Sequence, residues 1–180
     1  MTDVTIRPAL MGDMQECLKF DASYTTEHVW QMESRAATGG EITVTFRNVR
    51  LPRSMRVAYP HDAEALMADW RLRDAMLIAE RDHARVGYVT LSANPAQRVA
   101  QIGDLVVCPP HRRHGVGSAL IGTAMRWARE RDLKQIVVET QTKNQPAISL
   151  LNKLGFSFCG FKDRHYPNQD IALFFARAVR

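Results

Sequence analysis

The sequence predicts an α/β domain built on a mixed sheet, and three observations support this prediction. The length of 180 residues suits one domain, because two small domains would each have a thin core. Strand-like and helix-like patterns alternate in the order strand–helix, helix, three strands, helix, strand, helix, two strands. The strand expected at 133–140 is largely apolar, which indicates helices on both faces of the sheet. We therefore expect a single domain over residues 1–180.

The N-terminal part mixes short elements with one long extended segment. Residues 4–9 alternate apolar and polar side chains and predict a strand. A helix start follows at 12–13, and apolar residues recur at roughly helical spacing as far as Tyr24. Residues 41–59 alternate again, interrupted by one proline, and predict an extended arm or a hairpin. Residues 61–73 predict a short amphipathic helix.

The C-terminal part alternates more regularly between strands and helices. It predicts two strands and a turn over 75–93, a strand at 98–107, a helix at 117–131, a strand at 133–140, a helix at 146–154, and a final antiparallel hairpin over 156–161 and 171–179. Asn144 stands where an N-cap is expected, and Gly155 where a C-terminal cap is expected.

Net charge and hydropathy disfavour nucleic-acid binding and membrane insertion. Lys and Arg outnumber Asp and Glu by 24 to 19, which gives a net charge of +5. This charge suits solubility or an anionic partner such as nucleic acid or a phosphate-bearing cofactor. The chain has no long basic block with interleaved aromatic residues, so nucleic acid is disfavoured. No run of 18 apolar residues and no signal-peptide pattern is present, so we expect no membrane partner.

The cysteines and histidines indicate neither a disulfide framework nor a metal site. Cys17, Cys108 and Cys159 are odd in number and widely spaced. The six histidines show no spacing typical of metal ligands. We expect a cytoplasmic protein with free thiols and no bound metal.

The stretch CPPHRRHGVGSALIGTAMRWA, residues 108–128, joins a strand to a helix. It does not fit the pattern of a nucleoside-triphosphate loop, and Leu120 replaces the third glycine of a dinucleotide fold. The remaining pattern is Arg112-x-x-Gly115-x-Gly117. Glycines that let successive N–H groups converge at a helix N-terminus suit a bound anion such as a pyrophosphate. The alternative is a plain strand-to-helix turn.

A second motif lies about 27 residues beyond Gly117. In NQPAISLLNKLGF, residues 144–156, the pattern is N-x-x-A-x-x-L-L-x-K-x-G-F. Together the two motifs resemble the GNAT superfamily of acetyl-CoA-dependent N-acetyltransferases. The segments VVETQTKNQPA, GFSFCGF and DIALFF are most similar to its streptothricin-acetyltransferase-like branch. The resemblance covers residues 75–180 closely and 4–25 loosely.

The resemblance implies a fold and a cofactor, acetyl-CoA. The sheet should be mostly antiparallel, with the middle strands at 102–107 and 133–140 splayed apart to admit the pantetheine arm. The acceptor should be an amine of a small molecule or a peptide, and a homodimer is left open. The residues implied in cofactor binding are Leu105, Val106, Val107, Arg112, Arg113, His114, Gly115, Val116, Gly117, Ser118, Asn144, Ala147 and Leu151.

Acetyl transfer to an amine needs a neutral amine, a donor for the developing oxyanion and a route for the thiolate to leave. By resemblance to ribosomal-protein alanine acetyltransferases, Glu139 is the expected base; the alternative is a buried polar partner at the strand end. Asp104 is the second candidate, and its alternative is a structural cap or ion-pair partner. The resemblance places the oxyanion donor at a backbone N–H near Val106.

The sequence departs from the family pattern at Leu151, where a tyrosine that protonates the leaving thiolate is usual. Three interpretations stay open. The thiolate leaves unassisted or through water, another residue such as Tyr166 supplies the proton, or the domain binds acyl-CoA without catalysis. Tyr166 has its own alternative as a loop aromatic that packs on the sheet edge. An N-acetyltransferase is the favoured function, ahead of a non-catalytic acyl-CoA-binding domain and of a nucleic-acid-binding module.

Overall fold

The computed structural model describes residues 4–36, 39–61, 63–70 and 72–180. Its strands are β1 (Thr5–Pro8), β2 (Tyr24–Ala36), β3 (Ile42–Val57), β4 (Ala75–Arg81), β5 (Ala84–Asn94), β6 (Val99–Val107), β7 (Gln135–Gln141), β8 (Ser157–Lys162) and β9 (Ala172–Ala178). Its helices are α1 (Asp13–Cys17), α2 (Ala63–Trp70), the 3₁₀ turn η1 (Pro109–His111), α3 (Val116–Glu130) and α4 (Gln145–Lys153).

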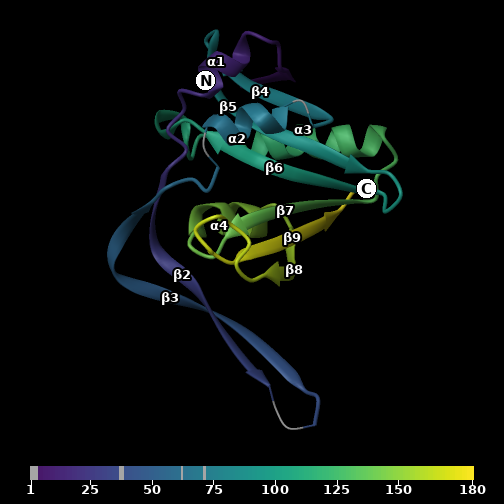
Figure 1. The fold of residues 1–180 in the computed structure, drawn as a ribbon. Coiled ribbons are helices and arrows are strands. Elements are labelled where there is room, and N and C mark those ends of the chain that lie inside the picture. Colours follow the sequence, from purple (N-terminus) through teal and green to yellow (C-terminus); the bar gives the residue numbers. More distant parts are fainter. Residues whose placement is uncertain (1–3, 37–38, 62, 71) are drawn as a thin grey trace.

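Within the described residues, seven strands form one sheet in the order β1-β4-β5-β6-β7-β9-β8, and β2 and β3 form a separate two-stranded ribbon. Among the strands that the structure describes in this sheet, only β6 and β7 pair in parallel, and the other neighbours are antiparallel. This confirms the α/β fold with a mixed, mostly antiparallel sheet. Figure 1 shows the ribbon passing beside α4 and extending well beyond the rest of the molecule.

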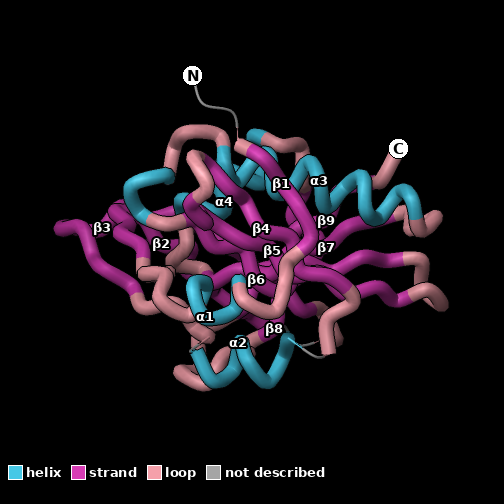
Figure 2. The backbone as a smooth tube through the Cα atoms, turned by 90° about the horizontal axis from the view of Figure 1, so that it is seen from above, coloured by secondary structure: helices cyan, strands magenta, loops and turns pink. Residues whose placement is uncertain are grey.

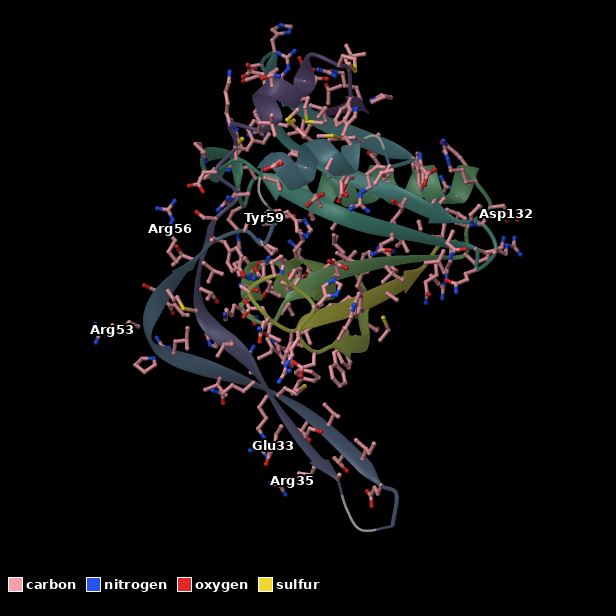
Figure 3. All side chains as sticks on the ribbon, in the orientation of Figure 1. Glu33, Arg35, Arg53, Arg56, Tyr59 and Asp132 are labelled. Carbon is pink, nitrogen blue, oxygen red and sulfur yellow. The ribbon has the colours of Figure 1, made fainter. Side chains whose placement is uncertain are left out.

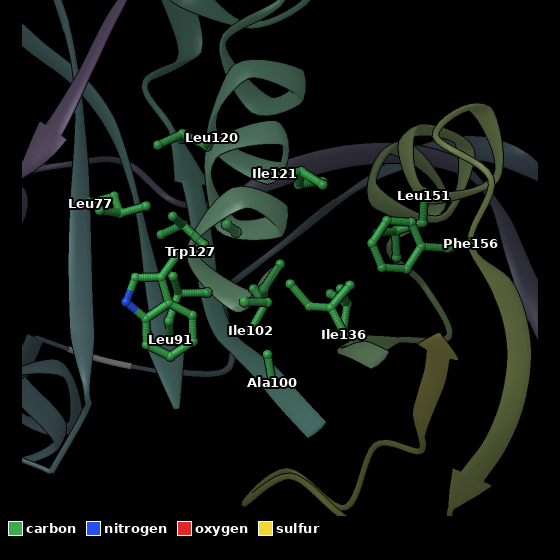
Figure 4. Close-up of a cluster of buried hydrophobic side chains, with 14 of the residues drawn as sticks. Leu77, Leu91, Ala100, Ile102, Leu120, Ile121, Trp127, Ile136, Leu151 and Phe156 are labelled. Carbon is green, nitrogen blue, oxygen red and sulfur yellow. The ribbon is translucent and has the colours of Figure 1, made fainter. Parts of the chain in front are cut away.

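Helices cover both faces of the sheet, as the apolar strand at 133–140 predicts. Figure 2 shows α1 and α2 on one side of the strands and α3 and α4 on the other. The larger core lies under α3 and α4, where Leu120, Trp127 and Leu151 pack on strand residues such as Ile102 and Ile136 (Figure 4). A smaller core under α1 and α2 contains Cys17, Leu66, Ile78, Tyr88 and Val106.

The ribbon corrects two predictions. The helix expected as far as Tyr24 ends at Cys17, and Tyr24 is the first residue of β2, a strand that the sequence did not predict. Residues 41–59 do form an extended arm, but they pair with β2. Between the pairs His28–Arg50 and Thr26–Met55 the register shifts, and Pro52 lies in this irregular stretch because it has no N–H to give to a ladder.

The middle of the sheet opens into a fork. β6 and β7 pair over only four positions, Val99–Ile102 with Gln135–Val138. Beyond Ile102 the pairing between β5 and β6 also shifts, so that Gly103 and Asp104 lie in a bulge. The predicted splay of the two strands is therefore present, and from Gly103 onward the edge of β6 that faces β7 carries no neighbouring strand among the described residues.

Candidate active site

The loop before α3 presents a row of backbone N–H groups. Arg113 and Gly115 have φ angles of 66° and 85°, which turn the chain sharply into the helix. Gly115 is the N-cap residue, and no side chain caps the helix. Among the described residues, no protein acceptor receives the N–H groups of residues 113–118. A helix start with converging, unpaired N–H groups fits the diphosphate of a cofactor.

Arg112 holds this loop in place with its side chain. Its guanidinium donates to the backbone oxygens of Val107, Ser23 and Asp21, each at 2.8 Å. These bonds tie the loop to the segment that leads into β2. Arg113 and His114 lie in the same loop and are exposed.

Close packing keeps the start of α3 near α4. A Cβ atom on Gly117 would lie 3.1 Å from Cδ2 of Leu150, so the Leu150 side chain would have to shift to make room for a side chain at this position. Asn144 caps α4 by accepting a hydrogen bond of 3.1 Å from the N–H of Ala147. Gly155 ends the helix with a φ of 76°. Both caps confirm the sequence prediction.

A cleft of about 520 Å³, which includes space open to solvent, lies in the fork between β6 and β7. It is lined by residues from five regions: Tyr59 (labelled in Figure 3), Pro60 and His61 before α2; Ile102, Gly103 and Leu105 on β6; Val138, Glu139, Thr140 and Gln141 on β7; Asn144, Ala147 and Leu151 at α4; and Tyr166 in the loop between β8 and β9. The unpaired edge of β6 and the start of α4 thus border one opening, which suits an extended, amide-bearing arm such as pantetheine.

Asp104 lies at the centre of a buried hydrogen-bond cluster on β6. Its side chain is 2% exposed and accepts from the Tyr59 hydroxyl at 3.0 Å and from Nδ1 of His61 at 2.7 Å through Oδ1. Its Oδ2 accepts from the Thr90 hydroxyl at 3.1 Å. Burial acts to raise the pKa of Asp104, but the hydrogen bonds and the charge of His61 outweigh it, so the pKa lies below its usual value.

Glu139 makes a second carboxylate–histidine pair on β7. Its Oε1 lies 3.2 Å from Nε2 of His165, and the Glu139 side chain is 11% exposed. Ile136 and Val138 point into the larger core, so Glu139 points to the opposite face, the side of α1 and α2. Asp104 shares the face of Val106, which belongs to the smaller core. Both carboxylates therefore lie on one side of the fork.

Tyr166 lies between the two pairs. Its ring centroid is 4.9 Å from that of His165 and 6.2 Å from that of His61. Burial raises the pKa of the phenol well above 10, so the hydroxyl stays protonated across the working pH range. Leu151, 1% exposed, borders the same cleft with a purely apolar side chain.

The structure brings together most of the residues that the sequence singled out. The cleft is lined by Glu139, Tyr166, Leu105, Asn144, Ala147 and Leu151, and Asp104 is hydrogen-bonded to the lining residues Tyr59 and His61. Residues 112–118 form the loop that leads into α3. Tyr59, His61 and His165 were missed. They lie in irregular segments, where no periodicity marks a residue, and each reaches its carboxylate across 26 to 45 residues of chain.

The match to a known family settles the class of protein. Residues 45–156 match the model of the acetyltransferase (GNAT) family, which is more than half of the chain. The chain belongs to the GNAT acetyltransferase family. As a GNAT enzyme it is an acetyl-CoA-dependent N-acetyltransferase, and its loop at 112–118 and its fork fit that substrate. The comparisons do not favour the alternative of a non-catalytic acyl-CoA-binding domain.

Several relatives of this GNAT chain carry a more specific name. It is 29% identical to the streptothricin acetyltransferase of Streptomyces lavendulae, over 89% of this chain and 85% of that protein. It is 36% identical to the streptothricin acetyltransferase of Escherichia coli, over 52% and 56%. The crystal structure of nourseothricin acetyltransferase superposes with a TM-score of 0.84 at 28% identity, over 99% and 100% of the two chains. A Bacillus anthracis structure in complex with acetyl coenzyme A shares the fold, with a TM-score of 0.75 at 23% identity, over 98% and 99%.

Two further observations concern the part of the chain that the structure describes. No helix there is long and apolar enough to cross a membrane. No three side chains of the His, Cys, Asp and Glu types converge there in a way that would hold a metal ion.

Proposed function

We propose that this GNAT enzyme transfers the acetyl group of acetyl-CoA to a cationic small-molecule amine of the streptothricin kind. The observation that carries the proposal is the pair of buried carboxylates, Asp104 and Glu139, on the same side of the fork. Glu139 lines the cleft, and in a chain of net charge +5 its carboxylate favours an ammonium group there over an anion. The names of the relatives from Streptomyces lavendulae and Escherichia coli support the same acceptor class.

The donor lies along the fork in this proposal. The N–H groups of residues 113–118 bind the pyrophosphate, with Arg112 holding the loop. The free edge of β6 at Leu105, Val106 and Val107 pairs with the pantetheine arm, and Asn144, Ala147 and Leu151 border the arm on the side of α4. A backbone N–H near Val106 stabilises the developing oxyanion. Acetyl-CoA supplies the acetyl thioester, and the chain positions it beside the acceptor.

Glu139 is the base in this proposal. A lysine-type amine has a pKa of about 10.4, so making it neutral at pH 7 costs about 4.6 kcal/mol. Glu139 is well placed to take the proton, because it faces the cleft and His165 orients its carboxylate at 3.2 Å. Asp104 is the second candidate, but three donors already occupy its oxygens, which suits a positioning role better.

The proposal also covers the extent of the catalytic domain and its place in the cell. We propose that residues 1–180 act as one catalytic domain and that the enzyme works in the cytoplasm, where its three free cysteines stay reduced. In this proposal the ribbon of β2 and β3 lies near the acceptor side, and it is attached to α4 through Trp30, whose Nε1 donates to Oε1 of Gln145 at 2.9 Å.

An amine panel tests the proposed function. Thiol release from acetyl-CoA is measured with streptothricin, a linear polyamine, a peptide with a free N-terminal alanine and a lysine-containing peptide. We expect streptothricin to give the highest kcat/KM, on the order of 10⁴ M⁻¹s⁻¹ or more, with one acetyl group added by mass spectrometry. A higher kcat/KM for either peptide would contradict a small-molecule acceptor.

A further inference from the structure

Acetyl transfer leaves a thiolate, and the usual source of its proton is absent here. Leu151 stands where the family pattern has a tyrosine, and its side chain carries no transferable proton. Apart from Glu139, the ionisable side chains that line the cleft are Tyr59, His61 and Tyr166, and their rings lie close together. One of these three side chains is therefore the candidate acid that protonates the thiolate.

The orientation of His61 favours it. Its Nδ1 lies 2.7 Å from Oδ1 of Asp104, so Nδ1 carries a proton and the other ring nitrogen, Nε2, points away from the carboxylate. The His61 side chain is 26% exposed and borders the same cleft as Leu151. No partner of Nε2 is found among the described residues. A histidine held by a buried aspartate through one nitrogen, with the other left free, is a familiar arrangement for proton transfer.

Tyr59 is committed elsewhere, because its hydroxyl donates to the same oxygen of Asp104 at 3.0 Å. Tyr166 has no such commitment, but its burial makes the phenol a much weaker acid than an imidazolium. We propose that His61, oriented by Asp104, is the catalytic acid that protonates the leaving thiolate of coenzyme A and so replaces the hydroxyl that Leu151 lacks. This inference rests on the acetyl transfer proposed above and adds the residue that completes it.

The amine nitrogen forms a bond to the acetyl carbon, and the carbon–sulfur bond breaks with its electron pair going to sulfur. The proton on Nε2 of His61 moves to that sulfur and gives the free thiol of coenzyme A. An ammonium acceptor loses two protons in all. Glu139 passes the first to solvent water before the attack, which makes the amine neutral, and it takes the second from the nitrogen once the bond to the acetyl carbon has formed. Water then carries one proton from Glu139 to His61, so the enzyme returns to its starting charge.

The charges around His61 favour its protonated form. The hydrogen bond to Asp104 raises the pKa of His61, burial lowers it, and the charges of Asp104, Glu139 and Asp69 raise it again, with a net increase. The phenols that surround the cluster, Tyr59, Tyr88 and Tyr166, have pKa values raised by burial and stay neutral. His61 therefore holds its proton to a higher pH than an unperturbed histidine, and an acid of this kind stops working once that proton is lost.

The experiment compares His61→Asn with the wild type in single-turnover reactions. Asparagine at this position keeps an N–H near Oδ1 of Asp104 but removes the donor at Nε2. The matched control is His83→Asn, because His83 is exposed in the turn between β4 and β5. Acetyl-CoA binding, measured by thermal shift, checks that each variant is folded. The acceptor is whichever primary amine the wild type acetylates.

We expect His61→Asn to slow the acetyl-transfer step by roughly 10²–10⁴-fold with little change in acetyl-CoA affinity. The wild-type rate should fall at alkaline pH as His61 loses its proton, and this fall should disappear in the variant. Adding Leu151→Tyr to His61→Asn should restore at least tenfold of the rate, because the phenol replaces the missing donor. A purely structural role of His61 would not be rescued in this way.

The proposal is wrong if His61→Asn leaves the single-turnover rate unchanged, or if the fall in rate at alkaline pH persists in that variant. It is also wrong if Tyr166→Phe lowers the single-turnover rate by the full expected factor and His61→Asn does not. The last result would assign the acid to Tyr166. None of these depends on streptothricin being the acceptor, so a failure of the proposed acceptor in the amine panel is distinguishable from a failure of this proposal.

Discussion

Oε1 of Glu139 lies 3.2 Å from Nε2 of His165, and this contact fixes the carboxylate at the mouth of the fork. The pair joins β7 to the loop between β8 and β9, so the acceptor side of the cleft depends on two segments that are 26 residues apart. If Glu139 takes the proton of the amine, its removal should be most harmful where the amine is most fully protonated.

Glu139→Gln keeps the shape of the side chain and removes its basicity. We expect kcat/KM at pH 7 to fall by roughly 10²–10⁴-fold and to recover as the pH approaches the pKa of the amine itself. The measurement is kcat/KM from pH 6 to 10, with Glu130→Gln, an exposed change at the end of α3, as the control. A pH profile in Glu139→Gln that matches the wild type would move the base to Asp104.

The loop before α3 should account for stabilisation by acetyl-CoA. At 100 times its dissociation constant, acetyl-CoA should stabilise the wild type by about 2.7 kcal/mol, read as a shift in Tm. Gly115→Glu combined with Gly117→Glu should abolish the shift, because two carboxylates would fill the N–H row. Gly122→Glu, in the same helix with open space around it, should keep the shift. A full response in the double variant would leave the loop as a turn only.

Leu151→Tyr should lower the free energy of unfolding without lowering the rate of turnover. Leu151 is 1% exposed in the larger core, so the bigger side chain should cost about 1–3 kcal/mol of unfolding free energy. Turnover should stay the same or rise, because the phenol reaches the cleft that Leu151 borders. Thermal unfolding and thiol release measure the two effects. A folded, acetyl-CoA-binding variant with a large loss of turnover would show that residue 151 acts differently here.

The buried carboxylate of Asp13, in α1, should make the unfolding free energy depend on pH in acid. Asp13 is 1% exposed and accepts from Arg7 at 2.6 and 3.0 Å, from Arg85 at 3.0 Å and from the N–H of Leu10 at 2.8 Å. The hydrogen bond from Arg7, against the effect of burial, holds the pKa of Asp13 well below its usual range. Asp13→Asn should therefore cost about 3 kcal/mol at neutral pH, since Arg7 and Arg85 lose their anionic partner.

The pH dependence of that cost has a definite sign. Because the pKa of Asp13 is lower in the folded state than the value near 3.9 in the unfolded state, its stabilisation is present above pH 4 and is lost as the pH falls further. The gap in unfolding free energy between the wild type and Asp13→Asn should therefore be constant from pH 5 to 7 and close in acid. Glu16→Gln, an exposed change in the same helix, should leave stability near the wild type. A gap that does not depend on pH would rule out the ionised Asp13.

The features that the sequence predicted are those encoded over a few residues. Gly115, Asn144 and Gly155 mark helix ends, where backbone angle and capping chemistry restrict the residue type, and all three were found in place. The strand β2 was missed because the register shift between Thr26 and His28 breaks its alternation. The helix expected as far as Tyr24 was too long because the apolar residues after Cys17 pack from a loop rather than from a helix face.

The acceptor side could not be predicted to the same depth. Glu139 and Asp104 were found through resemblance and strand position, but their histidine partners lie in irregular segments and meet them only in the folded chain. His61 stands just before α2, where the helical pattern at 61–73 assigned it to a helix that begins at Ala63. A single sequence holds no sign that His61 contacts a residue 43 positions away.

The short pairing between β6 and β7 also marks the point where the sheet passes from one continuous segment of the chain to the next. Every strand on the β6 side of the fork comes from residues 5–107, and every strand on the β7 side comes from residues 135–178. A cut in the turn at 131–134 would therefore leave each half of the sheet on one unbroken fragment. Acetyl-CoA would span both fragments, so the enzyme is suited to a split reporter in which reassembly of the two pieces depends on the ligand between them.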